Sequence, residues 1–302
     1  MALTGKVIES TGKWYKVEAN GEVTSCRLPG RFRLNSAEVT NPVTVGDRVD
    51  ISIGDDQTGI ITHIHDRDNF LPRQATHGRR GEQILAANID RAWAVVSVRQ
   101  PALKTGFLDR FLVACEAYGI PASILINKTD LASKRDWKQL EALRELYSGL
   151  GYPVHVASIH NSESIEELKT ALDGHTNVFI GPSGVGKTSL LNCLKPGADL
   201  TVGDISGYSN KGKHTTTVAR LLRIGDAGYI VDTPGIRELG LVNIEPYELS
   251  LYYPEMLKPR ENCKFNNCTH SHEPGCGVSA AFEAGEIHPE RYFSYLNILE
   301  SL

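Results

Sequence analysis

The chain has 302 residues, of which 41% are hydrophobic and 23% charged, and its formal net charge is −4. This length corresponds to two domains or three small ones, and the composition excludes a disordered tail, a collagen-like repeat and a disulfide-stapled miniprotein. The slightly negative charge provides no overall attraction to nucleic acid or to an anionic membrane. No stretch approaches the roughly 18 consecutive apolar residues of a membrane span, and the N-terminus lacks the apolar core of a signal peptide, so we expect a cytoplasmic protein without membrane contact.

Residues 1–68 are expected to form a small antiparallel barrel. Apolar and polar residues alternate in five short segments, which predicts strands at 5–9, 14–18, 23–28, 47–53 and 59–64. Turn signals such as Asn20-Gly21 separate these segments. Five strands in this length suit an OB-like barrel, although an SH3-like barrel has much the same pattern.

The pattern changes after the barrel. Residues 69–88 have no period and several Gly and Arg, which indicates a mildly basic linker. Residues 89–240 alternate apolar strands with helical patterns, which is typical of a doubly wound, mainly parallel α/β sheet. Its strands are expected at 92–98, 123–126, 154–157, 178–180 and 229–231, and its helical spacing is clearest at 108–115 and 140–147. Residues 241–302 lack this pattern and contain a cluster of cysteines. The segment ends in a predicted helix at 289–302.

A phosphate-binding loop is predicted where the strand at 177–180 meets the following helix. The motif G-x-x-x-x-G-K-S/T is carried by Gly181, Pro182, Ser183, Gly184, Val185, Gly186, Lys187 and Thr188. Its glycines let successive backbone N–H groups converge on phosphate, and the helix N-terminus adds a favourable dipole. We expect Lys187 to neutralise the β- and γ-phosphates, Thr188 to bind Mg²⁺, and Ser189 to complete the loop's nucleotide contacts. The alternative is a glycine-rich strand–helix turn without a ligand.

A second motif predicts the choice of base. It directly follows the strand at 123–126 and consists of Asn127, Lys128, Thr129 and Asp130. The Asp130 carboxylate accepts two hydrogen bonds side by side, which matches the N1–H and N2–H₂ donors of guanine and not the edge of adenine. We expect Asn127 to bond the far side of the base and to tie this loop to the phosphate loop, with the Lys128 stem over a face of the base. Ser158 follows the next strand and is either a backbone contact to the guanine oxygen or an ordinary strand-terminal serine.

A third motif, Asp232-Thr233-Pro234-Gly235, ends the strand at 229–231. Asp232 is expected to hold Mg²⁺ through water, and the Gly235 N–H to contact the γ-phosphate. Ordinary GTPases place the phosphate loop first and Asn-Lys-x-Asp last, whereas here Asn-Lys-x-Asp precedes the phosphate loop. A circular permutation reconciles this order with one sheet, and folds tolerate it when the original termini lie close together on the surface.

A metal site is predicted near the C-terminus. The spacing Cys-x₄-Cys-x-His-x₅-Cys is carried by Cys263, Cys268, His270 and Cys276. Three thiolates and one imidazole complete a tetrahedral Zn²⁺ shell, so we expect one structural zinc whose removal unfolds this segment. The cluster holds three cysteines, and this odd number and the expected cytosolic setting disfavour disulfides. Unligated cysteines remain an alternative, and His272 competes with His270 as the nitrogen ligand.

A barrel, a permuted GTPase and a Cys/His cluster, in that order, resemble the RsgA (YjeQ) family of circularly permuted GTPases over essentially the whole chain. The resemblance implies a GTP hydrolase that binds the small ribosomal subunit and its rRNA and assists late maturation. Hydrolysis would be stimulated by the subunit and coupled to release, with the protein acting as a monomer. The alternative is a zinc-containing RNA-binding module in which GTP is only a conformational ligand.

The resemblance also implies metal ligands. It favours His270 over His272 in the zinc cluster. In a polar, Gly-rich first switch at 199–217, it points to Thr216 as the residue that completes Mg²⁺ coordination, with Thr215 or Thr217 left open.

Catalysis is expected to depend on His214. Ile236 follows Asp-x-x-Gly where many GTPases carry a glutamine that orients water, so intrinsic hydrolysis should be slow. The family implies a catalytic histidine at His214, which would orient water or accept a proton. The alternative is a solvated histidine in a basic loop.

Overall charge does not point to RNA binding, because residues 1–68 carry about equal acid and base and the segment after 241 is acidic. The basic and aromatic candidates are Lys13, Trp14, Arg31, Phe32, Arg33, Arg73, Arg79, Arg80, Lys211 and Lys213. Exposed aromatic rings beside arginines stack on unpaired bases. The alternative, which we favour for Trp14 and Phe32, is that both rings belong to the barrel core.

Overall fold

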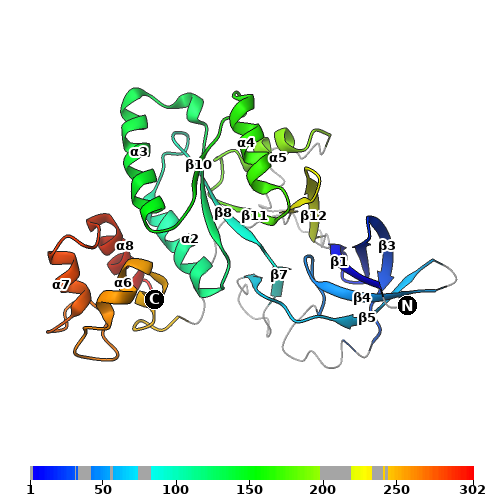
Figure 1. The fold of residues 1–302 in the computed structure, drawn as a ribbon, viewed down its shortest axis with the longest axis horizontal. Helices are drawn as coiled ribbons and strands as arrows, with labels where there is room; N and C mark the ends of the chain where they lie inside the picture. Colours follow the sequence, from blue (N-terminus) through cyan, green and yellow to red (C-terminus); the bar gives the residue numbers. More distant parts are fainter. Residues whose placement is uncertain are drawn as a thin grey trace, which may run out of the picture.

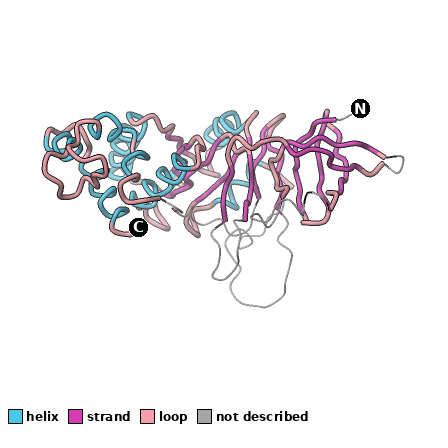
Figure 2. Tube along the Cα trace, turned by 90° about the horizontal axis from the view of Figure 1, so that it is seen from below, coloured by secondary structure: helices cyan, strands magenta, loops and turns pink. Residues whose placement is uncertain are grey.

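The computed structural model describes residues 3–30, 32, 42–54, 57–73, 83–197, 219–232, 241 and 244–302. Three parts follow one another along the molecule: a strand-rich part at the N-terminal end, an α/β part in the middle and a helical part at the C-terminal end (Figures 1 and 2). Among the described residues, no helix is both long and apolar enough to cross a bilayer.

The N-terminal part is a closed β-barrel, which confirms the prediction. Its strands are β1 (Leu3–Ser10), β2 (Trp14–Ala19), β3 (Glu22–Arg27), β4 (Arg48–Ile53) and β5 (Gly59–Ile64). β1 pairs with both β2 and β4, while β5 pairs with both β3 and β4, and these pairings close the ring. Alternate residues point inward, as the strand period requires, and the core contains Val7, Tyr15, Val17, Cys26, Val49, Ile51 and Ile61.

The segment expected to be an aperiodic linker contains a small antiparallel sheet. β6 (Phe70–Arg73) pairs with β7 (Gln83–Ala87). Ala86 forms a bridge with Val45, and Thr44 Oγ1 donates a hydrogen bond of 3.0 Å to the carbonyl of Leu85. These strands therefore depend on contacts with a distant part of the chain, which a local pattern does not reveal.

The central part is a sheet with the strand order β10-β9-β8-β11-β13-β12. The strands are β8 (Arg91–Ser97), β9 (Ala122–Asn127), β10 (Val154–Val156), β11 (Thr176–Ile180), β12 (Ala219–Ile224) and β13 (Gly228–Asp232). Neighbouring strands are parallel except for β12, which runs antiparallel to β13. β12 is an addition to the strands that the sequence predicts.

Helices cover both faces of this sheet (Figure 1). They are α2 (Thr105–Ala117), α3 (Lys134–Gly149), α4 (Ser162–Leu172) and α5 (Lys187–Leu194). Successive residues of β8 enter two separate cores: Ala94 packs with α2 and α3, whereas Trp93 and Val95 pack with α4 and α5. Burial on both faces is the reason that these strands read as continuous apolar runs, and it confirms the doubly wound arrangement.

The barrel joins the central sheet directly. β1 pairs with β12 at Glu9–Arg220 and Ser10–Ala219, so both parts share one 11-stranded sheet. Glu18 of β2 reinforces the join, because its carboxylate accepts hydrogen bonds from Arg223 at 2.7 Å and from the hydroxyl of Tyr229 at 2.6 Å. The barrel is thereby held against the strand pair β12–β13.

The C-terminal part is helical and packs on α2. Its elements are η2 (Leu249–Tyr252), α6 (Pro254–Arg260), α7 (Gly277–Glu283) and α8 (Pro289–Leu299). Arg291 of α8 forms a buried ion pair with Asp109 of α2, and its guanidinium also binds Glu255 of α6 at 2.6 Å. Val113 of α2 completes the core of this part. The C-terminal part is therefore joined to the central sheet by a charged contact and an apolar one.

Candidate nucleotide and metal sites

The predicted phosphate loop lies between the end of β11 and the start of α5, and two of its glycines are required for different reasons. Gly186 has a left-handed backbone with φ of +94°, and a Cβ there would lie 2.5 Å from Nδ2 of Asn127. At Gly181, a Cβ would lie 2.1 Å from the carbonyl oxygen of Val95 in β8. The loop therefore turns sharply while its backbone stays in close contact with its neighbours.

Lys187 and Thr188 begin α5, and both are buried. The Lys187 ammonium donates hydrogen bonds to the carbonyl oxygens of Gly181 at 2.5 Å and Pro182 at 3.0 Å, so it lies within the loop. A cation enclosed by a curved loop at a helix N-terminus is the arrangement that phosphate binding requires.

Hydrogen bonds join the guanine motif to the phosphate loop. Nδ2 of Asn127 donates to the carbonyl of Val185 at 2.8 Å, and Nζ of Lys128 donates to the carbonyl of Gly184 at 2.6 Å. The same ammonium donates to the carbonyl of Gln100 at 2.6 Å. The two loops therefore lie side by side at the carboxyl ends of β9 and β11, the edge at which open α/β sheets bind ligands.

Asp130 lies exposed in the short turn η1 (Thr129–Leu131), and a serine hydroxyl orients its carboxylate. Oγ of Ser158 donates to Oδ1 of Asp130 at 2.6 Å. The backbone N–H of Ser158 donates to Oγ of Ser164 at 3.2 Å. The contact that the structure shows between Ser158 and the guanine motif is thus made by the side chain. Ser164 belongs to no nucleotide motif, and its only sequence signal is its place three residues after Asn161, which caps α4.

The other predicted nucleotide residues divide between described and undescribed segments. Thr129 of the guanine motif contacts the residue that follows β10, because its hydroxyl donates to the carbonyl of Ala157 at 3.1 Å. Ser183 is exposed in the phosphate loop, and Asp232 ends β13 at the same edge of the sheet. The predicted residues outside the described parts of the chain are His214, Thr216, Gly235 and Ile236.

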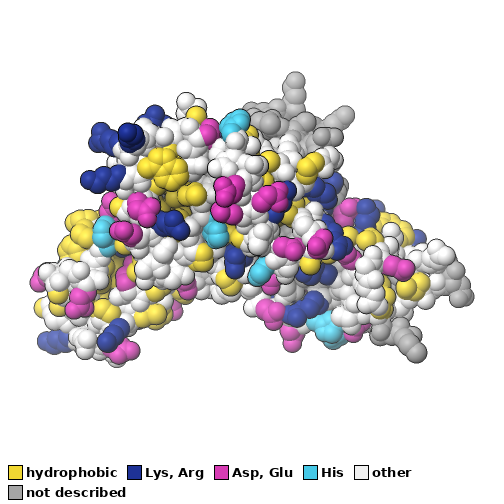
Figure 3. Space-filling view, turned by 45° about the horizontal axis from the view of Figure 1, so that its top comes forward, with side chains coloured by type: hydrophobic (Ala, Val, Ile, Leu, Met, Phe, Trp, Pro, Cys, Tyr) yellow, Lys and Arg dark blue, Asp and Glu magenta, His cyan; other side chains and the backbone are white. Residues whose placement is uncertain are grey.

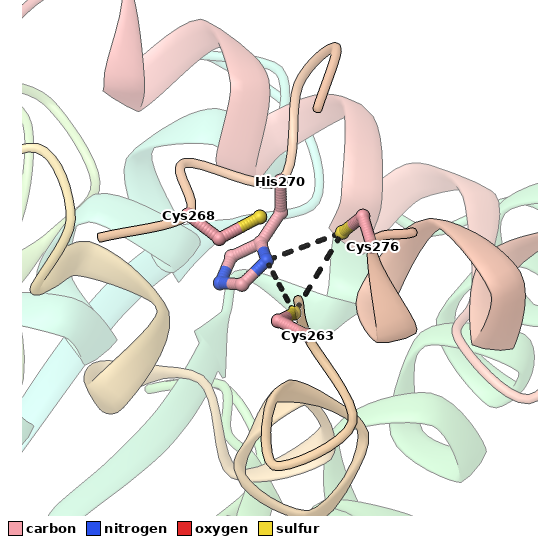
Figure 4. A group of neighbouring side chains, drawn as sticks. All are labelled: Cys263, Cys268, His270 and Cys276. Carbon is pink, nitrogen blue, oxygen red and sulfur yellow. Dashed lines mark hydrogen bonds between the residues drawn. The ribbon is translucent and has the colours of Figure 1, made fainter. Parts of the chain in front are cut away.

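The four predicted zinc ligands converge on one point (Figure 4). The ligand atoms of Cys263, Cys268, His270 and Cys276 all lie within 4.8 Å of one another. Nδ1 of His270 lies 3.4 Å from Sγ of Cys263 and 3.3 Å from Sγ of Cys276, and these two sulfurs are 3.9 Å apart. Two sulfurs bound to Zn²⁺ at about 2.3 Å in a tetrahedron are separated by about 3.8 Å, so the residues fit the ion. His272, the competing ligand, is exposed and lies outside the cluster.

The surroundings favour the metal-binding forms of His270 and Cys276, whereas burial raises the pKa of the Cys268 thiol to about 12. Burial lowers the pKa of His270 to about 4, so the imidazole is neutral near pH 7. Its Nε2 lies 3.0 Å from Oγ of Ser250, which directs Nδ1 towards the sulfurs. Burial alone would raise the pKa of Cys276, but hydrogen bonds from Ser279 outweigh it and hold the pKa of this thiol below its ordinary value. Ser250 belongs to no motif, and the sequence does not point to it.

Trp14 lies on the surface of the barrel, so the expectation that it belongs to the core is wrong. Its exposed fraction is 40%, and the guanidinium of Arg27 lies 4.3 Å from its ring centroid. Phe32 packs against the barrel core, as expected. Lys13 is exposed beside Trp14. The RNA candidates whose side chains lie outside the described part are Arg31, Arg33, Arg73, Arg79, Arg80, Lys211 and Lys213.

Comparisons with known proteins agree along the length of the chain. Residues 4–61 match the family model "RsgA N-terminal domain", and residues 64–242 match "RsgA GTPase". A relative from Bacteroides fragilis, named "Small ribosomal subunit biogenesis GTPase RsgA", is 42% identical over 299 residues, which cover 99% of this chain and 96% of that protein. The relative of the same name from Porphyromonas gingivalis is 42% identical over 305 residues, which cover 99% of this chain and 96% of that protein.

Two solved structures share the fold. The crystal structure of YjeQ from Thermotoga maritima aligns with a TM-score of 0.82 at 36% identity, and the match covers 100% of this chain and 99% of that one. The structure of YloQ, described as a circularly permuted GTPase, aligns with a TM-score of 0.79 at 31% identity. This match covers 100% of this chain and 95% of that one.

Proposed function

This chain belongs to the RsgA family of circularly permuted GTPases, and on that premise we propose that it binds the small ribosomal subunit and assists its late maturation. It is a GTP hydrolase, and in the proposed cycle the subunit stimulates hydrolysis and hydrolysis leads to release. The observation that supports this proposal most strongly is the direct contact between the guanine motif and the phosphate loop. Two motifs far apart in the chain thereby lie side by side and can form one nucleotide site.

In the proposed site, each end of GTP has its own residues. Asp130, with its carboxylate held by Ser158, accepts the two donors of the guanine edge. Lys187 turns its ammonium from the loop carbonyls to the β- and γ-phosphates, and the backbone N–H groups of residues 181–189 surround the phosphates. Thr188 and Thr216, and Asp232 through water, would hold Mg²⁺, which would supply charge neutralisation on the phosphates.

The catalytic step is assigned to His214. A glutamine that orients the attacking water is replaced by Ile236, whose side chain has no polar atom. His214 orients the water or accepts its proton when the subunit is bound. Slow turnover by the free protein and fast turnover on the subunit follow from this arrangement.

The barrel is the proposed contact with rRNA. Trp14 and Arg27 lie on neighbouring strands β2 and β3 and present a stacked ring and guanidinium at the surface. OB-type barrels bind oligonucleotides on this pair of strands, and aromatic rings with arginines stack on unpaired bases. The proposed division of labour is RNA binding by residues 1–68, joined through 69–88 to nucleotide hydrolysis by 89–240, with a zinc-stabilised domain at 241–302.

One assay tests the proposal. GTP turnover is measured for the purified protein with and without isolated small ribosomal subunits, and the His214→Ala variant is measured beside the wild type. We expect strong stimulation of the wild type, and a variant that still binds GTP but is not stimulated. Wild-type turnover unchanged by subunits would support the alternative, in which GTP is only a conformational ligand. Stimulation retained in the variant would remove His214 from the mechanism.

A further inference from the structure

Two side chains of the barrel reach across to the strands of the GTPase sheet. Lys6 of β1 and Glu18 of β2 lie opposite each other in the register of these two strands. In the sheet, Thr176 of β11 is paired with Tyr229 of β13, and Tyr229 is paired with Arg223 of β12, so these three residues form one row. We call the five residues the clasp. Figure 3 shows acidic and basic side chains close together where the barrel meets the central part.

Hydrogen bonds connect the clasp to all three strands. The two carboxylate oxygens of Glu18 accept hydrogen bonds from Arg223 at 2.7 Å and from the hydroxyl of Tyr229 at 2.6 Å. Nζ of Lys6 donates to Oγ1 of Thr176 at 2.9 Å and lies 5.0 Å from the ring centroid of Tyr229. Burial and the bond to Glu18 raise the pKa of the Tyr229 hydroxyl to about 12, so this hydroxyl keeps its proton and remains a donor near pH 7.

The three strands lead to the groups that are proposed to act on the phosphates of GTP. β11 is followed by the phosphate loop, which begins at Gly181. β13 ends at Asp232, and β12 begins at Ala219, two residues after the predicted first switch at 199–217. The clasp therefore holds the strands that carry these groups, although none of its five residues belongs to a nucleotide motif.

The barrel is attached to β12 and β13 a second time, beside the edge of the sheet where the nucleotide motifs lie. Glu9 of β1 is paired with Arg220 of β12, and Arg220 is paired with Asp232 of β13, so these residues form another row. The turn after β1 leads directly to Trp14, whose carbonyl accepts a hydrogen bond from the N–H of Thr11 at 3.0 Å. A body held along one row can pivot about it, whereas a body held along two rows moves together with the strands that hold it. The clasp supplies the second row.

We propose that Glu18 is a positioning residue for GTP hydrolysis: through the clasp, the barrel sets the positions of β12 and β13, and RNA bound to the barrel thereby changes the rate of turnover. Hydrogen-bond networks and rigid strands are the physical means by which such coupling is carried. This inference rests on the proposed function, because it takes the RNA of the small ribosomal subunit as the ligand of the barrel. Without the Glu18 carboxylate, the barrel keeps its RNA and the GTPase sheet keeps its nucleotide, but hydrolysis no longer responds to the RNA.

The test compares GTP affinity, turnover without subunits and turnover at saturating small ribosomal subunits, all with the full-length protein. Glu18→Ala removes both hydrogen bonds to the sheet, and we expect it to keep the first two quantities within about twofold while the third falls by about tenfold. Glu18→Gln keeps an acceptor oxygen, and its stimulated turnover should stay within about threefold of wild type. Tyr229→Phe removes one donor and should lower stimulated turnover by about threefold. Glu22→Ala is the matched control, because Glu22 is an exposed carboxylate on β3 that forms no ion pair within the described parts of the chain.

Thermal unfolding of the same samples verifies that the variants are folded, and Tyr229→Phe carries the test if Glu18→Ala is unstable. Stimulation of these variants equal to that of the wild type would overturn the inference while the proposed function stands. Equal losses with and without subunits would make Glu18 a purely structural residue, and a loss that disappears when more subunits are added would mean that it serves binding. Either result also overturns the inference. Wild-type turnover that does not respond to subunits would overturn the proposed function itself.

Discussion

Asp130 is the side chain that we propose sets the choice of nucleotide. Its carboxylate is exposed, but the Ser158 hydroxyl holds one oxygen at 2.6 Å and so limits the directions from which a base can approach. Two acceptors in a fixed orientation fit two donors on the base, and a base without them leaves the carboxylate unpaired.

Asp130→Asn is therefore expected to lower GTP affinity by about 100-fold or more and to raise affinity for xanthosine triphosphate, whose C2 carbonyl accepts from the new amide. Equilibrium titration with fluorescent analogues of the two nucleotides measures the change. Asp136→Asn is the control, because Asp136 belongs to the capping box of α3, pairs with Arg99 and lies outside both nucleotide motifs. Unchanged preference in Asp130→Asn would mean that the base is recognised elsewhere.

Gly186 lies where the two halves of the proposed nucleotide site meet. Gly186→Ala places a Cβ 2.5 Å from Nδ2 of Asn127, so the bond between the guanine motif and the phosphate loop must break or shift. We expect GTP affinity to fall by about tenfold or more, as measured by calorimetry. Gly197→Ala has a comparable backbone strain, with φ of +86°, but meets nothing within 4 Å, and its GTP affinity should stay near that of wild type. Equal losses in both variants would assign the effect to backbone strain alone.

The sequence predicts residues of the site that belong to motifs, and it does not predict those that support them. The spacing of the phosphate loop and of Asn127 to Asp130 depends on chemistry that the ligand imposes, so it is visible in one sequence. Ser164 and Ser250 each bond a predicted site residue through a hydroxyl, and other polar side chains at those places would serve. Gln100 accepts from Lys128 through its backbone carbonyl, which any residue has. Their positions follow from tertiary packing, which a local pattern does not contain.

At the scale of elements, the sequence predicts those strands whose faces are buried in a regular pattern, either on one side or on both. The barrel strands alternate and the central parallel strands are continuously apolar, because one or both of their faces are covered. β12 carries Arg220 and Arg223 among its apolar residues and pairs with β1 from the other end of the chain. β6 and β7 likewise depend on Val45 and Thr44. Elements stabilised by distant partners leave weak local signals.

The metal cluster is expected to hold the C-terminal elements together. Cys268 and Cys276 are part of the same core as Met256 and Tyr295, so loss of the ion removes cross-links inside that core. Chelation should cause the amides of α7 and α8 to lose hydrogen-exchange protection together, while amides of the barrel strands keep theirs. Adding Zn²⁺ back should restore protection. Protection that survives complete metal removal would show that the apolar core suffices.

At the scale of the whole molecule, one buried arginine connects the C-terminal part to the GTPase sheet. Arg291→Ala leaves the carboxylates of Asp109 and Glu255 buried without their cation, and we expect the free energy of unfolding to fall by about 3–5 kcal/mol. Urea denaturation, followed through the helical signal, measures the change. Arg144→Ala on the exposed side of α3 should change it by less than about 0.5 kcal/mol. A loss below about 1 kcal/mol in Arg291→Ala would mean that the carboxylates are protonated or hydrated in its absence.

The pairing of β1 with β12 has a consequence for dissecting this protein. A fragment that lacks the first strands would leave the amino-terminal end of β12 with bare N–H and C=O groups along its outer edge, and it would deprive Arg223 of Glu18. Unpaired strand edges recruit strands from other molecules, so such a truncation invites aggregation. The barrel thus covers an edge of the GTPase sheet that would otherwise be aggregation-prone. Fragments intended to contain the GTPase sheet should therefore include the barrel.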